Sequence, residues 1–387
     1  MTHPPITIWI SAGEVSGDMY GAALATELLA QYPNVKLIGL GGEKMKAAGV
    51  HLLDNVTSAS TIGFLEPIRH LKKYLSAYKI TKTHLKKHNP DIVVAIDFQG
   101  FNMKVLGYAK KLGLKTAYFI SPQEWQWGSD EGGKKVINAA DTILAIFKQE
   151  YEFYKRLGGN VTFVGHPLLD TVHPVMTRTQ FKTQFNLPDT KKWIAIFPGS
   201  RKQEITHVYP QLLKAAEKIH YAEPNTHLII SVAENGLHKS ILALLEKCAA
   251  PYTVIKGHTH DIITHTDLSL CACGTITLEH AILAKPCVTG YRLNPISYTL
   301  AFAIVGQKWK DQVGFIALPN IYLKKAIIPE FIQDECNSTN ILDAGLKRLT
   351  DPIHYQATQN HLKEVQKLLG QKGATHHAAK IILGIIQ

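Results

Sequence analysis

The sequence predicts an α/β protein with two similar domains, each built around a parallel sheet covered by helices on both faces. Apolar, strand-like runs alternate with stretches whose apolar residues recur at helical spacing, and this whole pattern begins again near residue 193. A chain of 387 residues is long enough for two domains of ~150 residues each. Two such domains facing each other across a cleft would bind ligands at the carboxyl ends of their strands.

Six apolar segments predict the strands of the first domain. Most are continuous apolar runs rather than alternating ones, which is typical of strands that are covered on both faces. Between them, residues 20–31 and 102–112 have the spacing of covering helices. The strands are predicted at residues 6–12, 35–40, 91–98, 116–120, 142–147 and 161–164.

A second set of strands follows a break in the pattern. The break consists of Gly165, His166 and Pro167 and a polar, proline-containing stretch that ends near Asp189, which is typical of a domain boundary. The strands of the second domain are predicted at residues 193–197, 227–232, 252–255, 268–271 and 287–290.

These patterns predict three parts of the chain: a first domain of residues 1–168, a second of 169–353 and a helical tail of 354–387. The tail contains predicted helices at 361–369 and 376–386. We expect it to pack back across the domains or onto a partner subunit, in which case the protein is a homodimer.

The composition excludes several classes of protein. With 45% hydrophobic and 19% charged residues, the chain is neither disordered nor a coiled coil. No apolar run reaches the ~18 residues that span a bilayer, and the N-terminus has no signal-peptide pattern. Five scattered cysteines do not make a disulfide framework. We therefore expect a soluble, cytoplasmic protein.

The net charge of +11 indicates an anionic partner. Nucleic acid, an acidic membrane surface and phosphorylated substrates all fit this charge, and the charge alone does not choose among them.

Acidic residues follow two predicted strands of the first domain. Glu14 and Asp18 lie in a glycine-containing turn after the first strand, and Asp97 ends the apolar strand at 91–98. An acid at the end of an apolar strand is costly unless it caps a helix or takes part in chemistry. A carboxylate at a helix start is held ionised, which suits a general base. We predict Asp97, Asp18 and Glu14 as candidate catalytic residues, with helix capping as the alternative.

Two turns of the second domain have the composition of a phosphate site. In the first, glycine and serine expose backbone N–H groups beside Arg201, whose guanidinium fits phosphate oxygens. In the second, Thr275 offers its N–H and hydroxyl group, and Glu279 lies one helical turn further, where it can accept from ribose hydroxyls. A surface turn is the alternative for each alone; together they predict a nucleotide-diphosphate site. Its residues are Gly199, Ser200, Arg201, Gly274, Thr275 and Glu279.

Sulfur and imidazole groups cluster in the same domain. Cys271 and Cys273 are predicted on one face of a strand, and His280 follows them. A metal site needs a second ligand pair at the usual spacing, and none is present, so we predict buried hydrophobic cysteines and no metal. His258 and His260 also lack partners in the sequence and are expected in loops or at the surface.

An apolar segment followed by cations predicts a basic amphipathic helix near residue 70. Such a helix can dock on an anionic membrane; the alternative is the solvated face of an ordinary covering helix. The residues predicted to contact the acceptor or the membrane are Phe64, Leu65, Ile68, Arg69, Lys72 and Lys73.

In order along the chain, these turns closely resemble the lipid-A-disaccharide synthase family, which are inverting glycosyltransferases with two Rossmann-like domains (GT-B architecture). Each motif alone is unspecific, but the ordered set from about residue 11 to 337 is highly specific. Two positions depart from the family pattern: Gly100 stands where many members have a second Asp, and Cys273 where Ser is usual. The matching segments are Ala12–Asp18, Gly63–Glu66, Ile96–Asp97 with Phe101–Asn102, Ser121–Trp127, Gly165–Pro167, Pro198–Arg201, Gly274–Thr275 with Leu278–Glu279, Gly290–Arg292 and Leu318–Asn320.

The resemblance implies a reaction and its partners. A 2,3-diacylglucosamine unit passes from UDP-diacylglucosamine to diacylglucosamine 1-phosphate and forms a β-1,6 disaccharide. UDP is expected in the second domain, with Arg201 on phosphate, Gly274 and Thr275 at the diphosphate and Glu279 on ribose. The resemblance favours Asp97 as the base, then Asp18, then Glu14. No cofactor, metal or nucleic acid is expected.

Anionic lipid substrates also account for the charge, and they imply peripheral association with the inner face of the inner membrane. Two rival functions stay open. One is another GT-B enzyme that uses UDP-N-acetylglucosamine, either a glycosyltransferase or a 2-epimerase. The other is a non-catalytic protein that binds nucleic acid or membranes, which has only the charge in its favour.

Overall fold

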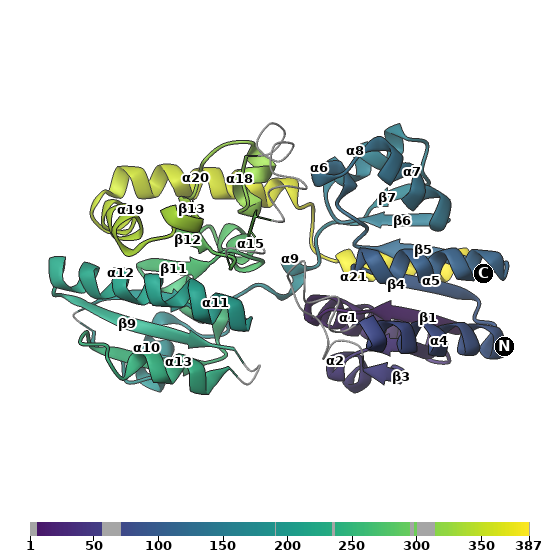
Figure 1. Ribbon diagram of the computed structural model, residues 1–387, viewed down its shortest axis with the longest axis horizontal. Helices are drawn as coiled ribbons and strands as arrows, with labels where there is room; N and C mark the ends of the chain where they lie inside the picture. The colour runs from purple at the N-terminus through teal and green to yellow at the C-terminus, as the bar shows by residue number, and fades with distance from the viewer. Residues whose placement is uncertain are drawn as a thin grey trace. The chain divides into compact units, whose positions relative to one another are not determined.

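The computed structural model describes residues 6–55, 71–189, 191–233, 237–294, 298–299 and 314–386. The chain forms two compact units (Figure 1). One unit comprises Met1–Asp170 and Leu369–Gln387, and the other comprises Thr171–Leu368. Each unit has its own parallel sheet, which confirms the predicted α/β class.

In the first unit, the described strands form one parallel sheet in the order β3-β2-β1-β4-β5-β6-β7. The order along the chain reverses between β1 and β4, which places a switch point there. Apolar runs such as that of β4, which is buried throughout, form the centre of the sheet. The strands are β1 (Thr7–Ala12), β2 (Lys36–Gly41), β3 (His51–Asn55), β4 (Ile92–Ile96), β5 (Lys115–Phe119), β6 (Thr142–Ala145) and β7 (Val161–Phe163).

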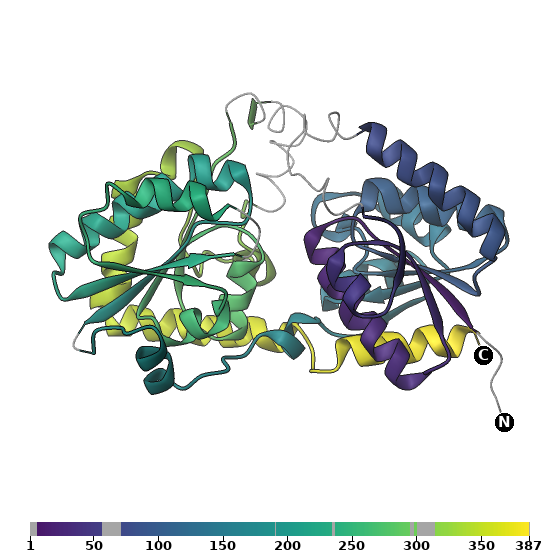
Figure 2. The ribbon, with the colours of Figure 1, turned by 90° about the horizontal axis from the view of Figure 1, so that it is seen from below.

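Helices cover both faces of this sheet. On one face, α1 packs beside α21, which comes from the end of the chain; Figure 2 shows the two side by side in purple and yellow. On the other face, α4, α5 and α7 bury apolar side chains against β4 and β5. The helices are α1 (Val15–Gln31), α2 (Glu43–Ala47), α4 (Leu71–His88), α5 (Gln99–Lys111), α6 (Glu124–Trp127), α7 (Asp130–Ala139), α8 (Lys148–Arg156), α9 (Leu168–Thr171) and α21 (Ala374–Ile386).

The sheet of the second unit has the order β10-β9-β8-β11-β12-β13, again parallel, and its switch point lies between β8 and β11. Its strands are β8 (Lys192–Phe197), β9 (Thr226–Val232), β10 (Tyr252–Lys256), β11 (Leu268–Ala272), β12 (Cys287–Tyr291) and β13 (Glu330–Ile332). Helices α12 and α19 bury their apolar faces on one side, while α14 and α15 pack on β8, β11 and β12. The helices are α10 (Arg178–Gln184), α11 (Lys202–His207), α12 (Tyr209–Ala222), α13 (His238–Leu245), α14 (Thr259–His265), α15 (Ile276–Ile282), α18 (Leu318–Leu323), α19 (Ser338–Thr350) and α20 (Pro352–Leu368).

The predicted tail is divided between the two units. Helix α20 belongs to the second unit, while α21 returns to the first. The division of the chain at residues 168 and 353 stays a prediction.

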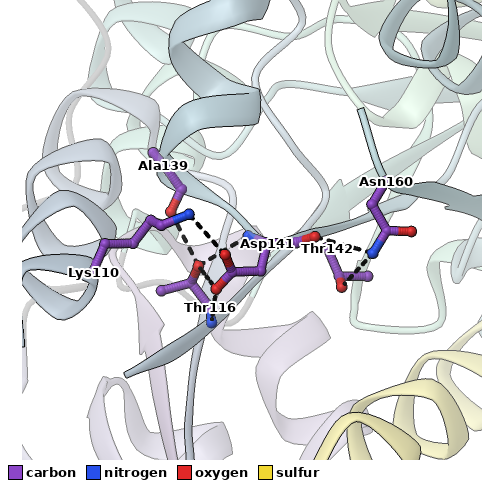
Figure 3. Close-up of polar contacts among 6 residues, drawn as sticks. All are labelled: Lys110, Thr116, Ala139, Asp141, Thr142 and Asn160. Atoms are coloured by element: carbon purple, nitrogen blue, oxygen red, sulfur yellow. Dashed lines mark hydrogen bonds and ion pairs between the residues drawn. The ribbon is translucent and has the colours of Figure 1, made fainter. Parts of the chain in front are cut away.

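Asp141 joins neighbouring strands at the amino ends of β5 and β6 (Figure 3). Its carboxylate accepts hydrogen bonds from Lys110 Nζ at 2.7 Å and from the backbone N–H of Thr116 at 2.9 Å. The Thr116 hydroxyl also donates to it at 2.8 Å. The Asn160 amide donates to the Asp141 carbonyl oxygen at 3.0 Å and so connects β7 to the same cluster. This cluster lies at the edge of the sheet opposite the strand carboxyl ends.

Replacing this carboxylate should make stability less dependent on pH. Burial raises the pKa of Asp141, but the bonds from Lys110 and Thr116 outweigh it and leave the pKa lowered. A lowered folded pKa contributes stability above the unfolded value of about 3.9, and this stability disappears as the pH falls through the folded pKa. Asp141→Asn should lower the free energy of unfolding by roughly 1 kcal/mol at pH 7, since the Asp141 side chain is 44% exposed and solvent screens its charge, and by less at pH 3. Urea unfolding at both pH values measures this.

Asp130→Asn is the matched control, because Asp130 forms an exposed ion pair with Arg156. We expect a smaller change there, since exposed ion pairs add little. An Asp141→Asn deficit that is equal at pH 7 and pH 3 would contradict the interpretation.

Candidate active site

Two turns meet at the switch point of the first sheet, where neighbouring strands β1 and β4 end. Gly13 follows β1, and a methyl carbon on it would lie 2.0 Å from the Phe98 ring, so the close approach of the two turns requires glycine. Asp97 and Phe98 follow β4 with φ of 50° and 52°. Two successive non-glycine residues in this left-handed region cost roughly 1–2 kcal/mol each, and such strain is concentrated at functional turns.

Asn102 holds both turns in place. Its side chain is fully buried, and its Oδ1 accepts from the Ser11 hydroxyl at 2.7 Å. Its Nδ2 donates to the carbonyl oxygens of Ser11 (3.1 Å), Ile96 (3.0 Å) and Asp97 (2.8 Å). The Tyr118 hydroxyl donates to the Asp97 carbonyl at 3.0 Å. The sequence analysis included Asn102 in a matching segment but assigned it no role. The structure shows that Asn102 fixes the backbone of Asp97, the candidate base.

The Asp97 carboxyl group is half-buried. One of its oxygens accepts from the Phe98 backbone N–H at 2.8 Å. Burial raises its pKa, and the bond from Phe98 opposes this only in part. A raised pKa makes the carboxylate a stronger proton acceptor, as a general base requires. A side chain at Gly100 would meet nothing within 4 Å, so the turn has room for the second acid that this chain lacks.

Asp18, the second candidate base, supports a helix. It is 6% exposed, and its Oδ1 accepts from the N–H groups of Gly42 (2.8 Å) and Met45 (3.0 Å). Its Oδ2 accepts from the Lys44 N–H at 3.1 Å. With both oxygens bound to backbone groups at the start of α2, this carboxylate has a structural role.

Glu14, the third candidate, lies in the turn between β1 and α1, next to the turn that carries Asp97. It is half-buried. Burial first and the charge of Glu14 second raise the pKa of Tyr74, which places Glu14 close to that phenol. The structure therefore brings Glu14 and Asp97 to one edge of the sheet.

A cavity of about 580 Å³ lies in the second unit, at the carboxyl ends of β8 and β11. Its position is the switch point of that sheet, and its volume is within the range of small-molecule sites, roughly 300–1,000 Å³. All six residues that the sequence predicts for nucleotide binding line it: Gly199, Ser200, Arg201, Gly274, Thr275 and Glu279.

Glu204 positions the arginine of this cavity. Its Oε1 lies 2.9 Å from Arg201 Nη1, and its Oε2 accepts from the N–H groups of Ser200 (2.8 Å) and Arg201 (3.2 Å). Glu204 is buried, whereas the Arg201 side chain is 42% exposed and accessible to an anion. The sequence analysis missed Glu204; its spacing of three residues from the start of α11 was the available signal.

Two histidines that the sequence analysis expected in loops or at the surface also line the cavity, and each lies beside a carboxylate. His258 Nδ1 lies 3.5 Å from Asp261 Oδ2, and His260 Nε2 lies 3.4 Å from Glu279 Oε2. Both residues follow β10, so their place after a strand at the same sheet edge was the signal. His260 therefore lies beside the Glu279 carboxylate on the cavity wall.

Four of the predicted membrane contacts, Phe64, Leu65, Ile68 and Arg69, lie outside the described residues. Lys72 and Lys73 lie in the first turn of α4. This helix buries Ala77 and Leu85 in the core of the first unit, so it is a covering helix. Its outer side carries the exposed Lys72 and Lys79 on either side of Leu75, which is 56% exposed. No described helix combines the length and the apolar character needed to cross a membrane.

Solved structures of other proteins share the fold of this chain. A putative UDP-N-acetylglucosamine 2-epimerase from Listeria monocytogenes superposes with a TM-score of 0.65 at 12% identity, covering 98% of this chain and 95% of its own. The glycotransferase of kitacinnamycin has a TM-score of 0.62 at 14% identity and full coverage of both chains. These similarities place the chain in the GT-B architecture.

Sequence comparison is more specific. The family model for lipid-A-disaccharide synthetase matches residues 8–384. The lipid-A-disaccharide synthase of Geobacter metallireducens is 32% identical over 385 residues, which is 100% of this chain and 98% of the relative. That of Sulfurihydrogenibium sp. is 33% identical over 397 residues, with 98% of each chain covered. A match along nearly the whole chain, together with two sheets whose switch points carry the expected residues, shows that the chain belongs to the lipid-A-disaccharide synthase family.

Proposed function

We propose that the second unit binds the UDP part of the donor and that Asp97 of the first unit is the general base. The chain is a glycosyltransferase that moves 2,3-diacylglucosamine from UDP to 2,3-diacylglucosamine 1-phosphate, forming a β-1,6 disaccharide and UDP. The observation that carries the nucleotide assignment is the convergence of six predicted residues on one cavity at a switch point.

In the proposed donor complex, the Arg201 guanidinium binds diphosphate oxygens. The same guanidinium donates a hydrogen bond to Glu204 Oε1, which fixes its position. Negative charge grows on the diphosphate as the bond from the anomeric carbon to the phosphate oxygen breaks. A preorganised cation and the N–H groups of the turn at Gly274 and Thr275 stabilise that charge. Glu279, which lies beside His260, accepts from the ribose hydroxyls.

At the acceptor, Asp97 takes the proton of the 6-hydroxyl group as the oxygen attacks the anomeric carbon. UDP leaves from the opposite face, so the configuration inverts and the new linkage is β. The raised pKa and the fixed backbone of Asp97 support this role. Asp18 binds three backbone N–H groups and is the weaker candidate, and Glu14 is the alternative in the neighbouring turn.

A transfer assay with defined substrates tests the proposed function. Incubation with UDP-2,3-diacylglucosamine and 2,3-diacylglucosamine 1-phosphate should release UDP and give a disaccharide with a β-1,6 linkage, which NMR identifies. UDP-N-acetylglucosamine alone is the control and should stay unchanged. Formation of its 2-epimer, without disaccharide in the first reaction, would support the epimerase alternative instead.

We also propose that the outer side of α4 and the preceding segment dock on an anionic lipid surface at the inner face of the inner membrane. The net charge of +11 and the exposed Leu75 between Lys72 and Lys79 support this. Substrates with acyl chains give the enzyme a reason to act at a bilayer. A homodimer stays a prediction of the sequence, and sedimentation equilibrium measures it.

Docking predicts a salt-dependent loss in a charge variant. Replacing Arg69, Lys72 and Lys73 with Gln should weaken binding to anionic vesicles at low salt, because each cation near such a surface contributes ~1 kcal/mol. Phe64→Ser with Leu65→Ser should release the protein at any salt concentration. Vesicle co-sedimentation measures both.

The matched control is Lys82→Gln with Lys86→Gln and Lys87→Gln, which removes three cations nearer the other end of the same helix. It should bind vesicles better than the first charge variant does. If the wild-type protein remains in the supernatant at low salt, then α4 is only a covering helix and does not dock on the membrane.

A further inference from the structure

Three potential metal ligands converge in the interior of the second unit. They are the Cys271 and Cys287 thiols and the His280 imidazole, and their ligand atoms all lie within 4.8 Å of one another. All three residues have no exposed surface. The cluster is the only group of this kind among the described residues.

The fold explains why these side chains meet. In the parallel pairing of β11 and β12, Cys271 lies opposite Thr289, two residues beyond Cys287, so the thiols occupy the same face of adjacent strands. Helix α15 packs on these two strands and adds His280. Cys273 was predicted on the same strand face as Cys271, but it lies beyond the end of β11 and lines the nucleotide cavity instead.

The histidine ring is arranged as a metal ligand. Its Nδ1 lies 2.8 Å from the carbonyl oxygen of Ile276, which can only accept, so Nδ1 carries the proton. The remaining nitrogen, Nε2, therefore presents a lone pair, and it is buried without a hydrogen-bond partner. A bond from Nδ1–H to a backbone carbonyl is the usual way to orient a metal-binding imidazole. A buried polar atom without a protein partner calls for an explanation, and a bound ion is one of them.

We propose that Cys271, His280 and Cys287 bind a thiophilic d¹⁰ metal ion, with Zn²⁺ as the expected occupant. Two thiolates and one imidazole are soft and borderline ligands that select such ions. The two thiol protons leave to solvent as the ion binds, and the neutral imidazole binds through Nε2. One Zn²⁺ with two thiolates carries no net charge, which suits an apolar interior. Three protein ligands hold the ion, and a water molecule would complete the tetrahedral set of four ligands that a structural Zn²⁺ ion requires.

Such an ion would be structural and separate from the transfer reaction. It would tie α15 to β11 and β12, and α15 carries Glu279 on the wall of the nucleotide cavity. The ion would therefore stabilise the fold of the second unit and hold the position of the ribose-binding carboxylate. Because the site is buried, we expect the ion to enter during folding and to resist chelators afterwards.

Metal analysis of the full-length protein tests the proposal. Protein made in zinc-supplemented medium and washed with chelator under reducing conditions should retain one zinc per chain by elemental mass spectrometry. Refolding with Co²⁺ should give a thiolate-to-cobalt charge-transfer band, a readout independent of activity. Wild-type protein without zinc and without this band would overturn the proposal.

Single substitutions test which residues bind the ion. Cys287→Ala and His280→Gln should each lose most of the bound zinc, because each variant keeps only two of the three protein ligands. Cys336→Ala is the matched control, because Cys336 is also fully buried in the second unit and lies outside the cluster. It should keep its zinc. Retention of zinc by Cys287→Ala would reject the assignment, and if that variant does not fold, His280→Gln and the wild-type cobalt spectrum decide.

Discussion

Asp97→Asn is expected to lower turnover by roughly 10²–10⁴-fold, the usual contribution of general-base catalysis. The amide has the shape of the carboxyl group and can still accept from the Phe98 N–H, but it cannot take the proton of the acceptor hydroxyl. UDP affinity should not change, because the residues that line the nucleotide cavity belong to the other unit. Steady-state kinetics and calorimetry with UDP measure the two quantities separately.

The pH profile gives an independent test of the same assignment. A base works only when it is deprotonated, so the rate should fall as the pH drops through the pKa of Asp97. Burial raises that pKa, and the acid limb should therefore lie above the usual carboxyl value of about 3.9. The limb should be absent from the Asp97→Asn profile.

Two further variants distinguish the roles of the three acidic residues. Asp18→Asn should mainly lower thermal stability, because Asp18 binds three backbone N–H groups at the start of α2. Glu14→Gln should retain most of the turnover. Loss of turnover in Asp18→Asn alone, with unchanged stability, would mean that Asp18 and Asp97 have exchanged roles.

Arg201→Ala and Glu279→Ala should each weaken UDP binding by about 1–3 kcal/mol, or roughly 5- to 150-fold, the range for a lost charge-assisted contact. For Arg201→Ala there is a second cause. Glu204 would stay in place through its bonds to the backbone of Ser200 and residue 201, and its charge would then repel the diphosphate. Isothermal titration with UDP measures both variants.

Arg178→Ala is the matched control for this experiment. Arg178 lies in the same unit, but its guanidinium stacks 4.1 Å from the Trp193 ring centroid and does not line the cavity. Its UDP affinity should equal that of the wild type. Wild-type affinity in both Arg201→Ala and Glu279→Ala would exclude the cavity as the nucleotide site.

Much of the fold could be predicted because the central strands are continuous apolar runs. The strands that the sequence analysis missed are β3 and β13, which lie at sheet edges. Strand β3 is half-exposed and has polar residues at its ends, and strand β13 has only three residues. Edge strands bury less surface, so they leave a weaker pattern in the sequence.

The residues of the site, too, could be predicted only where the local sequence carries the signal. Arg201 and Glu279 could be predicted because a strand-to-helix turn has a local composition that suits phosphate and ribose. The partners Glu204 and His260, and the role of Asn102, depend on which segments the fold brings together. Cys287 is the clearest case, since only strand pairing places it beside Cys271. Asp18 has the local pattern of a base, but its oxygens are occupied by groups far along the chain.

The return of α21 to the first unit has a consequence for biosynthesis. Both ends of the chain belong to this unit, so the second unit is in effect an insertion within it. On the ribosome, residues 171–368 are all made before α21 appears. Until then α1 lacks its neighbour α21, in which Ala378, Ile382 and Leu383 are buried. The N-terminal unit therefore completes its folding last, and its nascent form exposes an apolar face that is prone to aggregation.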